Sequence, residues 1–176
     1  MLNPTTVARV YYGAMKFPRA IRLDESDVQV YHRPATPGEW AVPGSFAFVD
    51  KKPTELEGKL LQAFNHGFLG TESFGWSTLV EVAEISDSEY QNVIDRLAAH
   101  FVQNYGAPDV PAALPAAREE ANFAASICDH DLHTLLMVER EAGEDGIVER
   151  FKVVRLNAAD HSKIKLWALE QNEDTD

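Results

Sequence analysis

The amino-acid sequence predicts an α+β fold: a mostly antiparallel sheet with two long helices and one shorter helix packed on one face. Two observations lead to this prediction. The longest segments with helical spacing of apolar residues follow one another, between residues 87 and 128. Strand-like segments lie on both sides, and the turn sequence Gly143-Glu144-Asp145-Gly146 joins two of them into a hairpin. Grouped helices and hairpin-connected strands are typical of α+β proteins.

The first part of the chain has the composition of strands and turns. Expected strands are Val7 to Tyr12, Phe17 to Leu23 and Val28 to His32, with a polar turn at Asp24 to Asp27. The segment RPATPGEWAVPG that follows has three prolines and two glycines, so we expect an ordered surface loop. Ser45 to Val49 then reads as another short strand.

The middle of the chain begins with the shorter helix. Thr54 and Glu57 have the spacing of a capping box, in which each side chain bonds the other residue's backbone N–H. We therefore expect a helix from Thr54 that ends at Gly67. Trp76 to Ile85 is apolar on both alternating faces apart from Glu81, which predicts a central strand.

Two long helices are predicted next. Asp87 to Tyr105 carries one apolar stripe, and Ser86 with Glu89 forms a second capping-box pattern in front of it. The second helix is expected from about Pro115, where proline suits the first turn, to Cys128.

The last third is predicted to be β structure. The two strands of the hairpin are Thr134 to Glu141 and Ile147 to Arg155, and His161 to Leu169 alternates as a third antiparallel strand would. The 176 residues, 45% hydrophobic and 25% charged, suit one domain. We expect a single α+β domain over residues 1–170 and a flexible acidic tail over residues 171–176.

Charge and cysteine content restrict the class of protein. The net charge of −12 argues against nucleic acid or an anionic membrane as partner, because both would be repelled. One cysteine cannot form an internal disulfide, and no signal peptide or membrane-spanning run is visible. We expect a cytoplasmic protein whose partner is another protein, while its oligomeric state stays open.

Several stretches together resemble a known family. They are PGEWAVPGSFAF (37–48), GFLGTESFGWSTLVEV (67–82) and HFVQNYGAPD (100–109), followed by AREEANFAASICDH (117–130). They are similar to a family of proteobacterial proteins of unknown function, and the likeness covers most of the chain. The family has no assigned activity, so the resemblance implies no catalytic residues. Its gene neighbourhoods hold lipoate or biotin ligase-like proteins and molybdoenzyme accessory proteins, which implies an accessory role in a cofactor-containing enzyme system.

The end of the second long helix has the residues that chemistry would use. Cys128, His130 and His133 are spaced C-x-H-x-x-H, and Glu120 falls on the apolar face of the same helix. With Glu120, these residues could bind zinc or iron. Alternatively, Cys128 is a small core residue, and Glu120 forms an ion pair with an arginine from the sheet, such as Arg19 or Arg22.

Other catalytic patterns receive little support from the sequence. A nucleophilic Cys128 would need an electropositive setting, and Asp129 and Asp131 make its surroundings negative. Ser73 and Ser77 lack a nucleophile-elbow motif. The glycines from 67 to 75 lack the spacing and the lysine of a phosphate loop.

Aromatic residues are concentrated between positions 40 and 76. This segment could line a ligand pocket or a protein-binding surface, for which we name Trp40, Phe68, Phe74 and Trp76, or it could be core. Because no convergent catalytic set is visible, we expect a non-catalytic accessory or protein-interaction domain without a cofactor. The alternatives are a zinc or iron protein using Glu120, Cys128, His130 and His133, and a small-ligand binder lined by the aromatic residues of 40–76.

Overall fold

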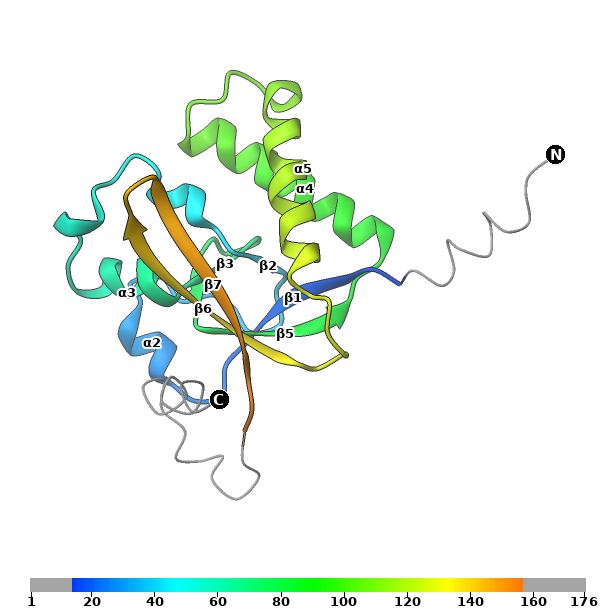
Figure 1. Cartoon of the computed structure of the whole chain (residues 1–176). Coiled ribbons are helices and arrows are strands. Elements are labelled where there is room, and N and C mark those ends of the chain that lie inside the picture. Colours follow the sequence, from blue (N-terminus) through cyan, green and yellow to red (C-terminus); the bar gives the residue numbers. More distant parts are fainter. Residues whose placement is uncertain (1–13, 157–176) are drawn as a thin grey trace.

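The structure of the protein is a computed structural model that describes residues 14–156. The expected strands Val7 to Tyr12 and His161 to Leu169, and the acidic tail 171–176, lie outside the described residues. The strands are β1 (Lys16–Ile21), β2 (Ala41–Val42), β3 (Phe68–Gly70), β4 (Trp76–Ser77), β5 (Leu79–Glu84), β6 (Leu135–Gly143) and β7 (Gly146–Val154), and the helices are α2 (Ser26–Val30), α3 (Gly58–His66), α4 (Asp87–Asn104) and α5 (Val110–Ser126) (Figure 1). The predicted α+β class is confirmed.

Two antiparallel sheets form the β structure. The larger sheet has the order β1-β5-β6-β7, and the smaller has the order β2-β3-β4. The central position of β5, between β1 and β6, agrees with the apolar residues on both of its faces. The predicted hairpin is present, with Gly143 paired to Gly146 across a two-residue loop.

The ends of α3 and α5 pack on one face of the larger sheet. Along β6, Leu136, Val138 and Arg140 alternate with residues of the other face and are all buried. Leu136 and Val138 pack with Cys128, just after α5, while Arg140 reaches the end of α3. Helix α4 lies against α5 (Figure 1). Their shared core includes Phe17 of β1.

Local signals place the start of α4 correctly. Ser86 accepts a hydrogen bond from the backbone N–H of Glu89 at 3.1 Å, and the Glu89 carboxylate accepts one from the N–H of Ser86 at 3.3 Å. The predicted capping box is therefore confirmed. Among residues 14–156, no helix is long and apolar enough to cross a membrane.

A strand was expected at Val28 to His32, but Val28 to Val30 belong to a short helix, α2. The cause is a tertiary contact. Asp27 and Tyr31 both hydrogen-bond the side chain of Thr78, each at 2.8 Å. Residues four apart reach one partner from consecutive turns of a helix, whereas a strand would separate them by about 13 Å.

The segment expected as a strand at Ser45 to Val49 is a 3₁₀-helix, Ser45–Phe48. It follows Gly44, which has a φ of 78°. The 3₁₀ geometry sends Phe46 to the aromatic residues of α4 and Phe48 to Phe64 and Trp76. A strand would not divide the two phenylalanines between these clusters, because residues i and i+2 of a strand share a face.

Two helix starts also differ from the prediction. Thr54 and Glu57 form no capping box: Thr54 lies in a 3₁₀ turn, Pro53–Glu55, and α3 begins only at Gly58. Helix α5 begins at Val110, because the Asp109 side chain accepts a hydrogen bond from the N–H of Ala112 at 2.8 Å. Pro115, expected in the first turn, lies inside this helix.

Candidate functional site

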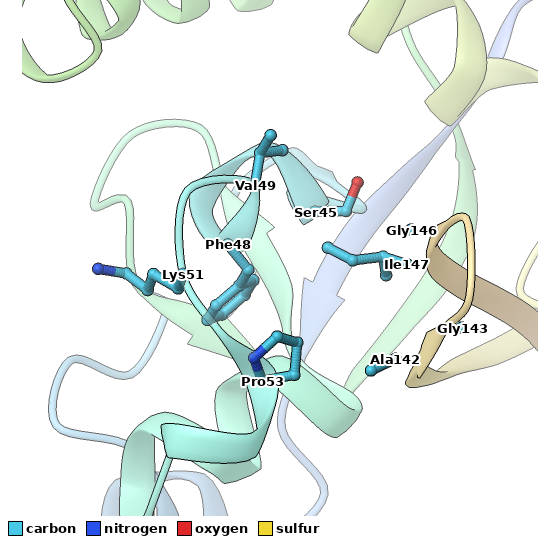
Figure 2. Close-up of a pocket in the computed structure, with 9 residues that line it drawn as sticks. All are labelled: Ser45, Phe48, Val49, Lys51, Pro53, Ala142, Gly143, Gly146 and Ile147. Atoms are coloured by element: carbon cyan, nitrogen blue, oxygen red, sulfur yellow. The ribbon is translucent and has the colours of Figure 1, made fainter.

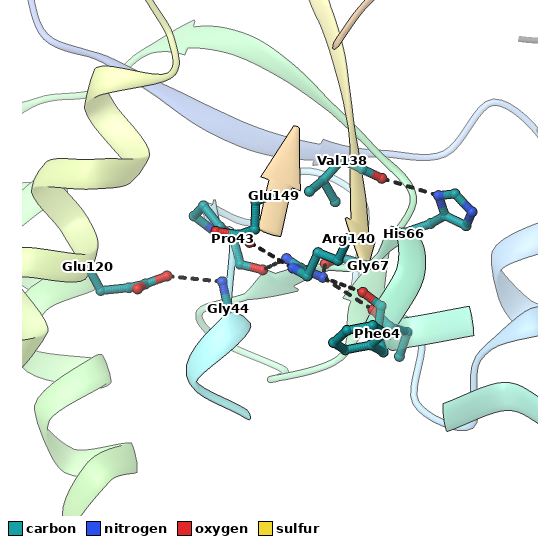
Figure 3. Close-up of polar contacts among 10 residues, drawn as sticks. Pro43, Gly44, Phe64, His66, Gly67, Glu120, Val138, Arg140 and Glu149 are labelled. Atoms are coloured by element: carbon teal, nitrogen blue, oxygen red, sulfur yellow. Dashed lines mark hydrogen bonds and ion pairs between the residues drawn. The ribbon is translucent and has the colours of Figure 1, made fainter. Parts of the chain in front are cut away.

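A buried arginine joins three parts of the fold. Arg140 extends from β6, and its side chain is fully buried. It donates hydrogen bonds to the carbonyl oxygens of Phe64 at 3.1 Å and Gly67 at 2.7 Å, at the end of α3, and to that of Pro43, after β2 (Figure 3). A cation at a helix C-terminus is favourable, because the last carbonyl groups there have no helical partner.

Glu149 balances the charge of this arginine. It is the cross-strand neighbour of Arg140 on β7, and its carboxylate accepts a hydrogen bond from Nε at 2.7 Å. Burial lowers the pKa of Arg140, and the nearby Glu149 carboxylate opposes that shift. Because a guanidinium group stays protonated in proteins, the two residues form a buried ion pair. We call Arg140, Glu149 and the carbonyl groups of Pro43, Phe64 and Gly67 the arginine clamp.

Glu120 lies beside the arginine clamp. Its Oε2 accepts a hydrogen bond from the backbone N–H of Gly44 at 2.9 Å (Figure 3). Burial raises the pKa of Glu120, the Gly44 hydrogen bond opposes this, and the charge of Glu149 adds to the rise. The carboxylate thus joins α5 to the loop after β2.

The prediction that Glu120 forms an ion pair with Arg19 or Arg22 is wrong. Arg19 forms an ion pair with Glu81, and Arg22 donates to the carbonyl of Ala35. The arginine that influences the pKa of Glu120 is Arg140, whose charge lowers it. The sequence does contain a signal for Arg140, since it falls on the same strand face as Leu136 and Val138.

Cys128 lies in the core. Its side chain is buried in an apolar cluster with Val80, Leu136 and Val138. Burial raises the pKa of the thiol to about 12, so it remains protonated and unreactive near neutral pH.

The two histidines after Cys128 are on the surface. His130 is exposed, and its carbonyl accepts a hydrogen bond from Lys16. The side chain of His133 is 74% exposed, and its Nδ1 lies 3.3 Å from the carboxylate of Glu81. Between residues 14 and 156, no group of three or more His, Cys, Asp or Glu side chains is placed to hold a metal ion. The structure therefore does not bring Glu120, Cys128, His130 and His133 together.

The two serines of the glycine-rich region are occupied by structural contacts. Ser73 Oγ donates to the buried carboxylate of Glu39 at 2.6 Å, and this carboxylate also accepts the backbone N–H groups of Glu72 and Ser73. Ser77 Oγ donates to the carbonyl of Leu79. Glu39 therefore holds the loop between β3 and β4 in one shape.

The aromatic residues named for an interaction surface have different environments. Phe68 is fully buried and belongs to the core, which corrects the surface position expected for it. Trp40 and Trp76 are half-buried; Trp40 donates to Glu89, and Trp76 packs on Phe48. Phe74 is half-buried and lines a surface pocket.

The structure also has a surface cavity that the sequence did not indicate. A cavity of about 300 Å³ lies between residues 45–53 and the tip of the β6–β7 hairpin (Figure 2). We call it the hairpin cavity. Its lining residues are Ser45, Phe48, Val49, Lys51, Pro53, Ala142, Gly143, Gly146 and Ile147. No local pattern could have revealed it, because the two walls lie about 90 residues apart in the sequence.

Comparison with known proteins gives one match. No curated protein and no solved structure is significantly similar to the chain. The model of a family of unknown function, DUF6505, matches residues 15–172. The resemblance to a family without an assigned activity is confirmed, and the chain belongs to this family of unknown function.

Proposed function

We propose that this protein is a non-catalytic accessory domain that binds another protein through the hairpin cavity. The observation that carries the proposal is the cavity itself, about 300 Å³ and lined mainly by apolar groups. Such a cavity is at the lower end of the range that ligand sites occupy. Its proposed occupant is one apolar side chain of the partner, of leucine or phenylalanine size.

The walls of the hairpin cavity favour an apolar occupant. Phe48, Pro53 and Ile147 present apolar side chains to it (Figure 2). Val49 is 75% exposed, the highest value among the large hydrophobic residues of the described chain. Covering such surface releases about 25 cal/mol for each Å² removed from water, so a single anchor side chain contributes about 1.5 to 3 kcal/mol. Lys51, also on the lining, would suit an acidic residue next to the anchor.

The arginine clamp supports both walls of the hairpin cavity. Arg140 lies two residues before Ala142, and Pro43 lies two residues before Ser45. Their hydrogen bond holds the start of one wall to the base of the other. Phe48 is further fixed by ring contacts with Phe64 and Trp76. A cavity with fixed walls loses little conformational entropy when a partner binds.

The contacts of the possible metal ligands give the metal alternative less support. Binding would require Cys128 to leave its apolar cluster and Glu120 to release the N–H of Gly44. The accessory role beside a cofactor-containing enzyme, which the resemblance implies, fits a domain that binds another protein.

The test compares two charged substitutions at exposed valines. Val49→Asp places a carboxylate at the hairpin cavity, and Val28→Asp places one on α2, where Val28 is 44% exposed. Both variants and the wild type serve as bait in extract of the natural host, with quantitative mass spectrometry of the captured proteins. The expected partner is enriched by the wild type and by Val28→Asp and is lost with Val49→Asp.

The affinity of the purified partner then shows whether the hairpin cavity is part of the interface. Calorimetry is expected to give an affinity at least about tenfold weaker for Val49→Asp than for Val28→Asp, because tenfold corresponds to about 1.4 kcal/mol. Equal affinities would remove the hairpin cavity from the interface. If no protein distinguishes the baits but apolar small molecules raise the melting temperature of only the wild type and Val28→Asp, the small-ligand alternative replaces this proposal.

A further inference from the structure

A second pocket of about 350 Å³ differs in chemistry from the hairpin cavity. It lies where the loop after α2, the loop between β3 and β4, and the second half of α4 meet. Its lining residues are Arg33, Phe74, Arg96, Ala99, His100, Gln103 and Asn104. Two guanidinium groups line it, and no described carboxylate does, in a chain whose net charge is −12. We call it the basic pocket.

The positive charge of the basic pocket is barely compensated within the described chain. Arg33 forms no side-chain ion pair with any residue from 14 to 156. The guanidinium of Arg96 lies 3.9 Å from the carboxylate of Glu72, and both side chains are about half exposed. A contact so long and so exposed contributes little. Two arginines that share a pocket repel each other, and an anion between them relieves that repulsion.

Neutral hydrogen-bond donors accompany the arginines. The Asn104 side-chain amide lies 3.1 Å from His100 Nδ1 and 3.3 Å from the His100 carbonyl. An amide N–H₂ that donates to both leaves Nδ1 as an acceptor, so that the ring proton is on Nε2. Burial and the charge of Arg33 lower the pKa of His100, which keeps the ring neutral. His100 and Gln103 are therefore side chains that can donate without adding charge.

The aromatic wall of the basic pocket is held in an unusual conformation. Phe74 has a φ of 52°, which is rare for a bulky residue, and its ring is stacked on His100 with centroids 3.8 Å apart. The loop before it is fixed by the Glu39 carboxylate. Its other side is fixed by close contact, since a Cβ on Gly75 would lie 2.4 Å from the carbonyl oxygen of Pro34. Strain of this kind persists where the surrounding structure enforces it, and it gathers at binding sites.

We propose that the basic pocket binds the phosphate or carboxylate group of a small anionic ligand. Arg33 and Arg96 supply the charge-assisted hydrogen bonds, and His100 and Gln103 supply neutral ones. The planar guanidinium group fits both kinds of oxyanion in a bidentate manner. The basic pocket shares no lining residue with the hairpin cavity, so this inference stands independently of the proposed protein partner.

The test is a titration of the full-length protein with inorganic phosphate and with citrate. Sodium chloride of equal ionic strength is the reference, because exposed charges respond to salt in general. Binding is followed by calorimetry and by the imidazole NMR signals of His100. Arg33→Gln and Arg96→Gln remove one charge each, and Arg118→Gln, at an exposed position of α5, is the matched control.

We expect saturable binding of at least one of the two anions, with a shift of the His100 signals. Each pocket variant is expected to lose about tenfold or more in affinity, as for a lost charge-assisted hydrogen bond, and Arg118→Gln is expected to bind as the wild type does. The anion that saturates identifies the group as phosphate or carboxylate. A linear response equal to that of chloride, or unchanged affinity in both pocket variants, would overturn the proposal.

Discussion

Glu120 shows how one half-buried carboxylate can serve a structural purpose. It sits on the apolar side of α5, and its carboxylate accepts a hydrogen bond from the backbone N–H of Gly44, at the start of a 3₁₀ turn. The neighbouring Glu149 and the burial both disfavour its charged form. Glu120 therefore stabilises a loop through a hydrogen bond, while its own ionisation costs free energy.

Replacing Glu120 by glutamine tests this interpretation. A carboxyl group whose pKa is higher in the folded than in the unfolded state binds more protons when the protein is folded. Its contribution to stability is therefore greatest below the ordinary pKa of 4.5. That contribution is lost as the pH rises through the raised pKa of the folded state. Glutamine keeps an oxygen for Gly44 without the charge. Glu120→Gln is expected to be as stable as the wild type or more stable at pH 7, with a gain that shrinks toward about pH 4.

Urea unfolding of both proteins across that pH range is the measurement. Glu55→Gln, at an exposed position of the 3₁₀ turn Pro53–Glu55, is the control and is expected to show no such pH-dependent difference. A Glu120→Gln variant that is destabilised more at pH 7 than at pH 4 would mean that the charged carboxylate is favourable in the folded state.

Among the helices and strands, the sequence correctly predicted those whose signals lie within their own residues. Helix α4 has its capping box and its apolar stripe within its own residues, and the β6–β7 hairpin has its turn. The elements whose type was predicted wrongly depend on contacts with residues distant in the sequence. Helix α2 is held by Thr78, about 50 residues away, and the turn at Ser45–Phe48 depends on the conformation of Gly44 against Leu69. Local propensity yields to such tertiary contacts.

Two glycines with the same backbone angle separate conformational strain from crowding. Gly44 has a φ of 78° and Gly106 a φ of 77°, but a Cβ on Gly44 would lie 2.6 Å from Leu69 Cβ, whereas nothing lies within 4 Å at Gly106. Gly106→Ala is expected to cost about 1 kcal/mol, from left-handed strain alone. Gly44→Ala is expected to cost about 2 to 4 kcal/mol, because overpacking adds to the strain.

Chemical denaturation of the two alanine variants gives these free energies. Equal costs at both positions would show that Leu69 does not crowd Gly44, and the loop after β2 would then be looser than described.

For the whole molecule, the arginine clamp is the point where distant segments meet. One side chain ties β6 to the end of α3 and to the loop after β2, and Glu149 adds β7. The sequence could place Arg140 on the inner strand face, but not which carbonyl groups it would meet, because that depends on how α3 and β2 pack. The hairpin cavity has the same origin, since its walls come together only in the folded chain.

Removal of the clamp is expected to destabilise the protein strongly. Arg140→Met leaves the Glu149 carboxylate and several carbonyl groups buried without their partner, at a cost of about 3 to 5 kcal/mol. Arg150→Met breaks a pair whose side chains are 56% and 59% exposed, and is expected to change stability by less than about 1 kcal/mol.

The free energies of unfolding in guanidinium chloride check this contrast. The double variant Arg140→Met with Glu149→Gln is expected to recover part of the loss, because it no longer buries an unpaired charge. If the single Arg140→Met variant were as stable as Arg150→Met, the clamp would not hold the fold together.

Crosslinking at the rim of the hairpin cavity tests whether this cavity binds a partner protein. A photo-crosslinking amino acid replaces the exposed Val49, and in a matched protein it replaces the exposed Val28. Both proteins are irradiated in extract of the natural host, and adducts are identified by mass spectrometry. We expect one dominant adduct at position 49, joined beside an apolar residue of the partner, and none at position 28. The same set of adducts at both positions, or no adduct at position 49, would contradict it.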